Sequence, residues 1–387
     1  MDFRFTAEQE KFRQELRHFL QREVTPELLE ELEARGEEGY SREFTQQVAR
    51  KGWIGLAWPK EYGGQGLGYI ERLIYNEEMV YRKAPWGYHF FGDRQHGPSF
   101  IAAGTEKQKK TYLPRITSGE AGFCVGYTEP GAGSDLASVQ TRAVADGDDF
   151  VINGQKMYTS GAHYSDHIWL ATRTNPDVPK HKGISILIVD MKLPGVAVRP
   201  LITMDGGRTN EVFFDDVRVS KDCLVGEKDR GWYIMAANLD YERSGIERVT
   251  EYLRLFEGIV QFVRDASRDN SFMCNPIVEN KLAEMSIEFR VGQLLAYRVA
   301  WMQSQELIPN YEASMSKVFG SELSQRVANV GMQVMGLYGQ LEKGSKWAQL
   351  QGRIERTYLR SVSDTVRGGS SEIQRNIIAT RGLELPR

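Results

Sequence analysis

The chain has 387 residues, of which 41% are hydrophobic and 26% charged, so it is long enough for two or three globular domains. Its net charge of −3 argues against a nucleic-acid-binding protein, and its three widely spaced cysteines, Cys124, Cys223 and Cys274, argue against a disulfide framework or a zinc site. The N-terminus is acidic where a secretory signal would be apolar, and no apolar run approaches the ~20 residues of a membrane span, so we expect a cytoplasmic protein.

The first 118 residues have the spacing of amphipathic helices. Thr6 with Gln9, and later Thr105 with Gln108, form capping-box patterns at two helix starts. The run 53–66 is rich in glycine and breaks the helical period, which predicts a loop. The apolar residues that share one face of the first helix are Phe12, Leu16, Phe19 and Leu20. We therefore expect an α-helical domain over residues 1–118.

Residues 119–228 have the pattern of short strands. Asn153-Gly154 stands between two β-rich runs, 149–152 and 155–158, and predicts a two-residue hairpin turn. Further β-rich runs cover 168–171, 184–189 and 212–214. We expect a small β-barrel or sandwich. The segment lacks both βαβ alternation and the G-x-G-x-x-G fingerprint, which argues against a Rossmann domain.

Helical spacing returns after Gly231 and continues almost to the C-terminus. Long amphipathic helices with short connections predict an antiparallel bundle over residues 229–387. The predicted fold class is α+β multidomain: a helical domain, a middle β domain and a helical bundle. The residues of the clearest helix stripe are Leu253, Phe256, Ile259, Val260 and Val263.

Two sequence signatures resemble those of acyl-CoA dehydrogenases. The first combines residues 127–135 with residues 153–161, and the second covers residues 369–379. The α-β-α order and the segment 59–64 fit the same family over essentially the whole chain. The resemblance implies FAD-dependent α,β-dehydrogenation of an acyl-CoA thioester to the trans-2-enoyl-CoA. It also implies electron-transfer flavoprotein or a similar electron acceptor.

The resemblance assigns a set of cofactor contacts. A glycine-rich turn lets backbone N–H groups approach the flavin and its pyrophosphate closely. Tyr158 occupies the place of an aromatic side chain against the flavin ring. The segment 268–276 departs from the family pattern, so the pyrophosphate arginine is not placed. The remaining flavin residues in the subunit itself are Val125, Tyr127, Thr128, Gly133, Ser134 and Ser160. Those for a neighbouring subunit's flavin are Gln333, Gly336, Leu337, Ser370 and Glu372. This sharing implies an oligomer, either a homotetramer built as a dimer of dimers or a heterotetramer.

The catalytic base is predicted from a substitution. Many relatives carry the base just before the second signature, where this chain has Gly368. Glu242 occupies the family's other base position, on the first helix of the C-terminal bundle, and is assigned to α-proton removal while flavin N5 takes the β hydride. Gly368 still offers a backbone N–H to the thioester carbonyl. The residues assigned to substrate binding are Ser134, Asp240, Arg243 and Gly369.

Two alternatives stay open. In the first, the chain is a non-catalytic or half-site partner subunit of a heteromeric acyl-CoA dehydrogenase, because position 368 lacks a carboxylate and 268–276 is altered. In the second, it is a flavin oxidase, desulfinase or monooxygenase on the same scaffold.

The sequence does not identify the acyl group. Arg94 is either a partner for a distal carboxylate of the substrate or a surface or interface arginine. The predicted acyl-pocket residues are Trp86, Tyr88, Phe90, Phe91, Asp93 and Arg94.

Overall fold

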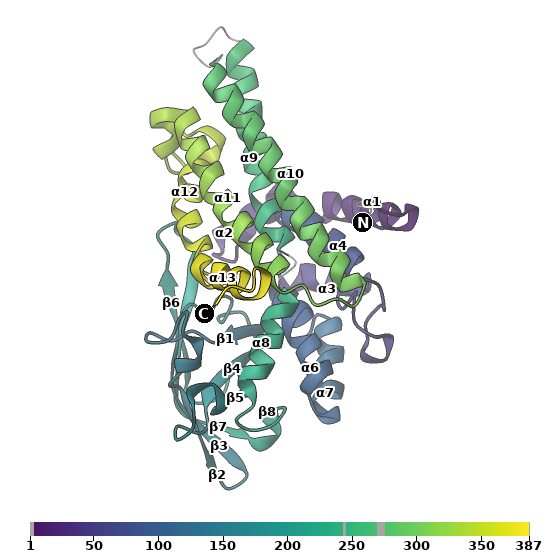
Figure 1. Cartoon of the computed structure of the whole chain (residues 1–387), viewed down its shortest axis with the longest axis vertical. Coiled ribbons are helices and arrows are strands. Elements are labelled where there is room, and N and C mark those ends of the chain that lie inside the picture. Colours follow the sequence, from purple (N-terminus) through teal and green to yellow (C-terminus); the bar gives the residue numbers. More distant parts are fainter. Residues whose placement is uncertain (1–3, 243–244, 269–274, 387) are drawn as a thin grey trace.

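The computed structural model describes residues 4–242, 245–268 and 275–386, without the side chains of 239–242 and 268. Helices come first, a sheet follows, and a second group of helices ends the chain (Figure 1). This order confirms the predicted fold class. Within the described residues, no helix is both long enough and apolar enough to cross a membrane.

The N-terminal region is helical, as predicted. Both capping boxes are present: the Thr6 side chain accepts a hydrogen bond from the Gln9 N–H, and Thr105 does the same for Gln108. The run 53–66 is a loop that contains a single short 3₁₀ turn, Lys60–Tyr62. The helices are α1 (Ala7–Glu23), α2 (Pro26–Ala34), α3 (Arg42–Arg50), α4 (Tyr69–Tyr81), α5 (Gly87–Phe91), the π-helical turn η2 (Gly92–His96), α6 (Gly97–Ala103) and α7 (Glu106–Thr117).

The middle region is one eight-stranded sheet. Its strands run in the order β6-β7-β3-β2-β4-β5-β8, and β1 pairs with β4. Most pairs are antiparallel, whereas β1 and β2 run parallel to β4. The strands are β1 (Phe123–Gly126), β2 (Arg142–Asp146), β3 (Asp149–Lys156), β4 (His167–Arg173), β5 (Ile184–Asp190), β6 (Val196–Ile202), β7 (Arg208–Ser220) and β8 (Leu224–Val225).

The hairpin turn predicted at Asn153-Gly154 is wrong. Both residues lie inside β3, and the chain turns between β2 and β3 at Gly147, which has a φ of 59°. Asn153 instead lies opposite a β-bulge, where the register between β3 and β7 shifts. Its side-chain amide donates to Asp216 and accepts from the Asp216 N–H, both at 2.9 Å. The extra residue of the bulge is in β7, where Asp215 and Asp216 together face Asn153.

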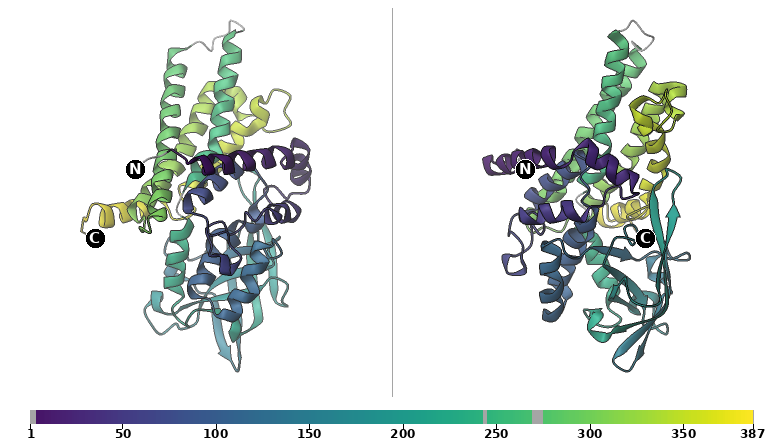
Figure 2. Two further views of the ribbon diagram at one scale, coloured as in Figure 1. Left: turned by 90° about the vertical axis from the view of Figure 1, so that its right-hand side faces the viewer. Right: turned by 180° about the vertical axis from the view of Figure 1, so that it is seen from behind.

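The C-terminal region is a helical bundle. The two long helices α9 and α10 lie side by side and extend away from the sheet (Figure 2). The predicted stripe on α9 is in the core, where Phe256, Ile259 and Val263 pack with Leu323 and Val327 of α11. The helices are α8 (Gly231–Glu242), α9 (Ile246–Arg268), α10 (Pro276–Ser304), α11 (Tyr311–Met335), α12 (Arg353–Asp364) and α13 (Ser371–Ile377).

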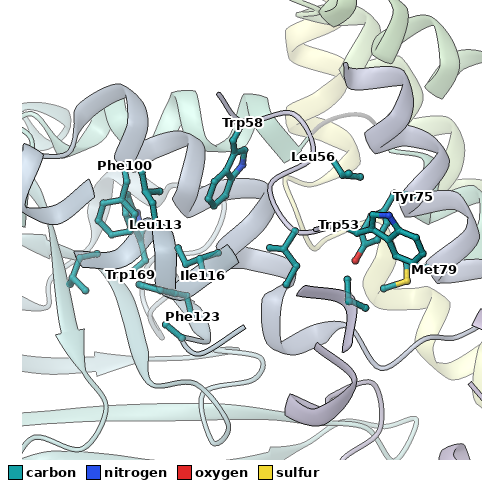
Figure 3. Close-up of a cluster of buried hydrophobic side chains, with 14 of the residues drawn as sticks. Trp53, Leu56, Trp58, Tyr75, Met79, Phe100, Leu113, Ile116, Phe123 and Trp169 are labelled. Atoms are coloured by element: carbon teal, nitrogen blue, oxygen red, sulfur yellow. The ribbon is translucent and has the colours of Figure 1, made fainter. Parts of the chain in front are cut away.

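An aromatic core joins the N-terminal helices to the sheet (Figure 3). Phe100 of α6 meets the Trp169 ring of β4 edge-on with 5.2 Å between centroids, and His96 of η2 stacks on the same indole at 4.9 Å. Phe123 of β1 and Met235 of α8 belong to this cluster. The packing fixes β1, and therefore the loop that follows it, relative to helix α8.

Candidate active site

The loop after β1 presents its backbone to solvent. The Thr128 carbonyl accepts from the Met157 N–H at 2.8 Å, and Glu129 and Ala132 exchange two backbone hydrogen bonds. Gly133 and Ser134 are exposed, and their N–H groups donate no hydrogen bond to any described residue. A Cβ built on Gly133 would meet no atom within 4 Å. Open N–H groups in such a turn suit an anionic or carbonyl-bearing ligand.

Tyr158 lies two residues after the end of β3, in an unusual conformation. Its φ is 54°, in the left-handed region that few bulky residues adopt, and its side chain is 59% exposed. The neighbouring Ser160 hydroxyl lies 3.2 Å from the Thr209 hydroxyl. The Met157 N–H to Thr128 carbonyl bond joins this segment to the loop with the open backbone donors, and an exposed ring together with such donors fits a planar cofactor such as FAD. Of the other predicted flavin residues, Val125 is half-buried and Tyr127 is buried.

A buried ion pair supports this loop, and the sequence analysis did not assign it. Lys156 of β3 is wholly buried, and its ammonium group lies 2.7 Å from the Glu129 carboxylate. It also donates to the Tyr127 carbonyl at 3.1 Å. Both charged residues belong to the first signature, but a lysine in a predicted strand gives no sign that it points inward.

The second signature begins in a tight turn between α12 and α13 and continues along α13. Gly368 and Gly369 have φ values of 65° and 85°, in the region that favours glycine. Ser370 is the N-cap of α13, and its hydroxyl accepts from the Ile373 N–H at 3.4 Å. A Cβ on Gly369 would lie 2.4 Å from the Gln374 side-chain nitrogen. Gly368 and Gly369 are exposed, so the backbone of this turn is open to a ligand.

Two helices of the bundle hold the start of this turn. The carboxylate of Asp364, at the end of α12, accepts a short hydrogen bond from the Tyr252 hydroxyl of α9. The Asp364 carbonyl accepts from the Lys317 ammonium of α11 at 3.3 Å. Burial lowers the pKa of Lys317 to about 8. The position of the Gly368 N–H is thus tied to α9 and α11.

The predicted base stands on helix α8. Asp240 and Glu242 belong to its last turn, but their side chains lie outside the described ones, and Arg243 lies outside the described residues. The segment 268–276, which departs from the family pattern, also lies mostly outside the described residues. Their roles therefore stay predictions.

The residues predicted to reach a neighbouring subunit's flavin are mostly on the surface. Gln333 is exposed and accepts from the Lys281 ammonium. Gly336 is exposed with a φ of 54°, and Leu337 is 82% exposed. Glu372 is exposed as well. A leucine so open to solvent is consistent with coverage by another chain.

Arg94 is buried, so the alternative of a surface arginine is wrong. Its guanidinium lies 2.7 Å from the Glu247 carboxylate, at the start of α9, and 4.7 Å from the centroid of the Phe90 ring. Asp93 beside it accepts from the Gly55 N–H at 2.7 Å. Burial raises the pKa of Asp93 and lowers that of Arg72 on α4. The charge of Arg94 is therefore paired inside the protein by Glu247, which lies five positions after Glu242.

Comparison with known proteins decides the family. The acyl-CoA dehydrogenase N-terminal domain matches residues 6–120, the middle domain matches 124–217 and the C-terminal domain matches 229–383. The chain belongs to the acyl-CoA dehydrogenase family. It is therefore an oxidoreductase of acyl-CoA metabolism, and members of this family are FAD-dependent flavoproteins.

Three relatives cover almost the full length of the chain. Acyl-CoA dehydrogenase FadE26 of Mycobacterium tuberculosis is 39% identical over 100% of this chain and 99% of its own. A structure described as the Tcur3481-Tcur3483 steroid ACAD has a TM-score of 0.90 and 36% identity, with 100% of both chains covered. The ChsE4-ChsE5 complex from Mycobacterium tuberculosis has a TM-score of 0.88 and 37% identity, again with 100% of both chains covered.

Proposed function

We propose that this acyl-CoA dehydrogenase takes the α proton of its substrate with Glu242. The observation that carries the proposal is Gly368, which has no side chain and adopts a left-handed conformation that a glutamate rarely takes. The carboxylate must then come from elsewhere, and Glu242 ends the helix that packs against the aromatic core through Met235.

Other groups of the chain are proposed to polarise the substrate and to bind it. The Gly368 N–H is proposed to polarise the thioester carbonyl, since a fixed backbone donor contributes a few kcal/mol to such a reaction. Ser134, Asp240, Arg243 and Gly369 are proposed to hold the CoA ester. The loop after β1 and the segment at Tyr158 would hold FAD, which would supply the acceptor for the β hydride.

The test is the replacement Glu242→Gln, which keeps size but cannot accept the proton. Flavin bleaching by a CoA ester under anaerobic conditions should slow by about 10²–10⁴-fold, while substrate binding changes little. Glu284→Gln, at an exposed glutamate of α10, is the control and should bleach normally. Bleaching by the Glu242 variant within tenfold of the normal rate would refute the assignment. Fast reaction of the reduced protein with oxygen would instead favour an oxidase or monooxygenase.

The description of one relative supports a proposal for the substrate class. We propose a ring-bearing acyl group, because a relative of 36% identity is described as a steroid ACAD. A panel of straight-chain, branched and steroid CoA esters, scored by bleaching, tests this point. A higher rate with straight-chain esters would contradict it. The physiological acceptor is proposed to be electron-transfer flavoprotein or a similar protein.

We propose that the chain forms a homotetramer with one FAD per chain. A heterotetramer with a second, related chain is the alternative, since two structural relatives carry names of two components. Light scattering of the purified chain, combined with the FAD-to-protein ratio, separates the two. A tetramer with a ratio near one supports the homotetramer, whereas loss of FAD until a second chain is supplied supports the heteromer.

A further inference from the structure

The buried pair Lys156–Glu129 connects three parts of the chain. The Lys156 ammonium donates to the Glu129 carboxylate at 2.7 Å and to the Tyr127 carbonyl at 3.1 Å. The same carboxylate accepts from the backbone N–H groups of Gln140 and Thr141, at 2.5 and 2.9 Å. One ion pair therefore joins the loop after β1, the segment before β2 and the end of β3.

Such a pair is costly to bury and contributes little to stability compared with apolar residues of the same size. Burial lowers the pKa of Lys156 to about 8. Burial alone would raise the pKa of Glu129, but the Lys156 ammonium and the hydrogen bonds to Gln140 and Thr141 together lower it. Each group therefore stabilises the charged form of the other. Their hydrogen bonds fix the Tyr127 carbonyl and the N–H groups of Gln140 and Thr141 in place.

The fixed atoms border the proposed flavin site on two sides. Tyr127 and Glu129 begin the loop whose Gly133 and Ser134 N–H groups are open, and Lys156 stands two residues before Tyr158. The Met157 N–H to Thr128 carbonyl bond lies between these contacts. A shift of the ion pair would move the loop and the aromatic ring relative to each other.

We propose that Lys156 and Glu129 are positioning residues for FAD, which hold the 127–134 loop and Tyr158 in the geometry that binds the flavin. The inference rests on the proposed function of the loop. The pair Lys180–Asp135, at the far end of the same loop, is the natural contrast because both of its side chains are more than half exposed. Exposed pairs of this kind contribute little.

The experiment measures the FAD dissociation constant and the urea midpoint of the full chain for four variants. Lys156→Met and Glu129→Gln each leave one buried charge without its partner, and each should weaken FAD binding more than tenfold and lower the urea midpoint. The double variant removes both charges, so its midpoint should recover towards that of the unaltered protein. Its FAD affinity should stay more than tenfold weaker than that of the unaltered protein, because the hydrogen bond from Lys156 to the Tyr127 carbonyl is absent. Lys180→Met should keep an FAD dissociation constant within twofold of that of the unaltered protein and should leave the urea midpoint nearly unchanged.

The double variant separates positioning from folding. A double variant with a normal midpoint and normal FAD affinity would overturn the proposal, as would a loss of FAD affinity in Lys180→Met equal to that in Lys156→Met. If single variants fail to fold, the double variant alone decides. An unaltered protein that is folded but binds no FAD would refute the proposed function as well, whereas unchanged affinity in the variants refutes only the positioning role.

Discussion

The ion pair between Arg94 and Glu247 gives the sharpest stability prediction. The two side chains are 2% and 14% exposed, so Arg94→Met would leave a carboxylate in the interior without its cation. Breaking a buried pair from one side typically costs about 3–5 kcal/mol. The Glu247 side chain keeps some contact with solvent, and this contact reduces the cost of leaving its charge without a partner. We therefore expect the lower end, about 3 kcal/mol.

The assay is urea unfolding followed by circular dichroism at saturating FAD. Arg94→Met should unfold at a clearly lower urea concentration, and Arg94→Met combined with Glu247→Gln should recover part of the loss because the unpaired charge is removed. Arg218→Met is the control, because it breaks a pair with Asp146 in which both side chains are more than half exposed. Equal midpoints for the Arg94 and Arg218 variants would refute the reasoning, as would a double variant less stable than Arg94→Met.

Three further predictions concern packing, pH and helix capping. Gly97→Ala should destabilise by about 1–3 kcal/mol or more, because the new Cβ would lie 1.8 Å from the buried ring of Trp58; a thermal midpoint equal to that of the unaltered protein would contradict it. Burial lowers the pKa of His96 to about 3. As the pH falls below about 6.5, His96 is therefore protonated in the unfolded chain but stays neutral in the folded chain, and the folded state loses stability. The resulting loss of stability, on the order of 3 kcal/mol near pH 4.5, should shrink in His96→Phe, and equal acid sensitivity of both proteins in urea titrations would disprove it. Ser370→Ala removes the α13 cap and should cost about 1 kcal/mol, measured by thermal unfolding, whereas Ser370→Asp should retain stability.

Local patterns in the sequence predicted local structure well. The capping boxes at Thr6 and Thr105 depend on residues three positions apart, and both form as expected. The β-rich runs 168–171 and 184–189 became β4 and β5 because their side chains are buried on the sheet. The turn predicted at Asn153-Gly154 is wrong because the Asn153 side chain bonds to a bulge in the neighbouring strand β7, and nothing in its own strand indicates that contact.

Contacts between distant residues could not be predicted. Arg94 meets Glu247 across more than 150 residues, and neither carries a local signal of burial. Lys156 lies in a strand where lysine is usually exposed, yet it points inward towards Glu129. The role of Glu242 stays a prediction, since it rests on the resemblance and on the glycine at 368.

The aromatic core has a consequence for how such a chain can be divided. Residues from α1 to α8, including Leu16, Trp53, Trp169 and Met235, belong to one buried cluster. The segments that match as separate N-terminal and middle domains are therefore halves of a single packed body. Expressed alone, the sheet would present Trp169 and its neighbours to water and should aggregate. Chimeras between relatives should fold when the N-terminal and middle segments come from the same relative. The junction between these two segments should contain few sites that a protease can cleave.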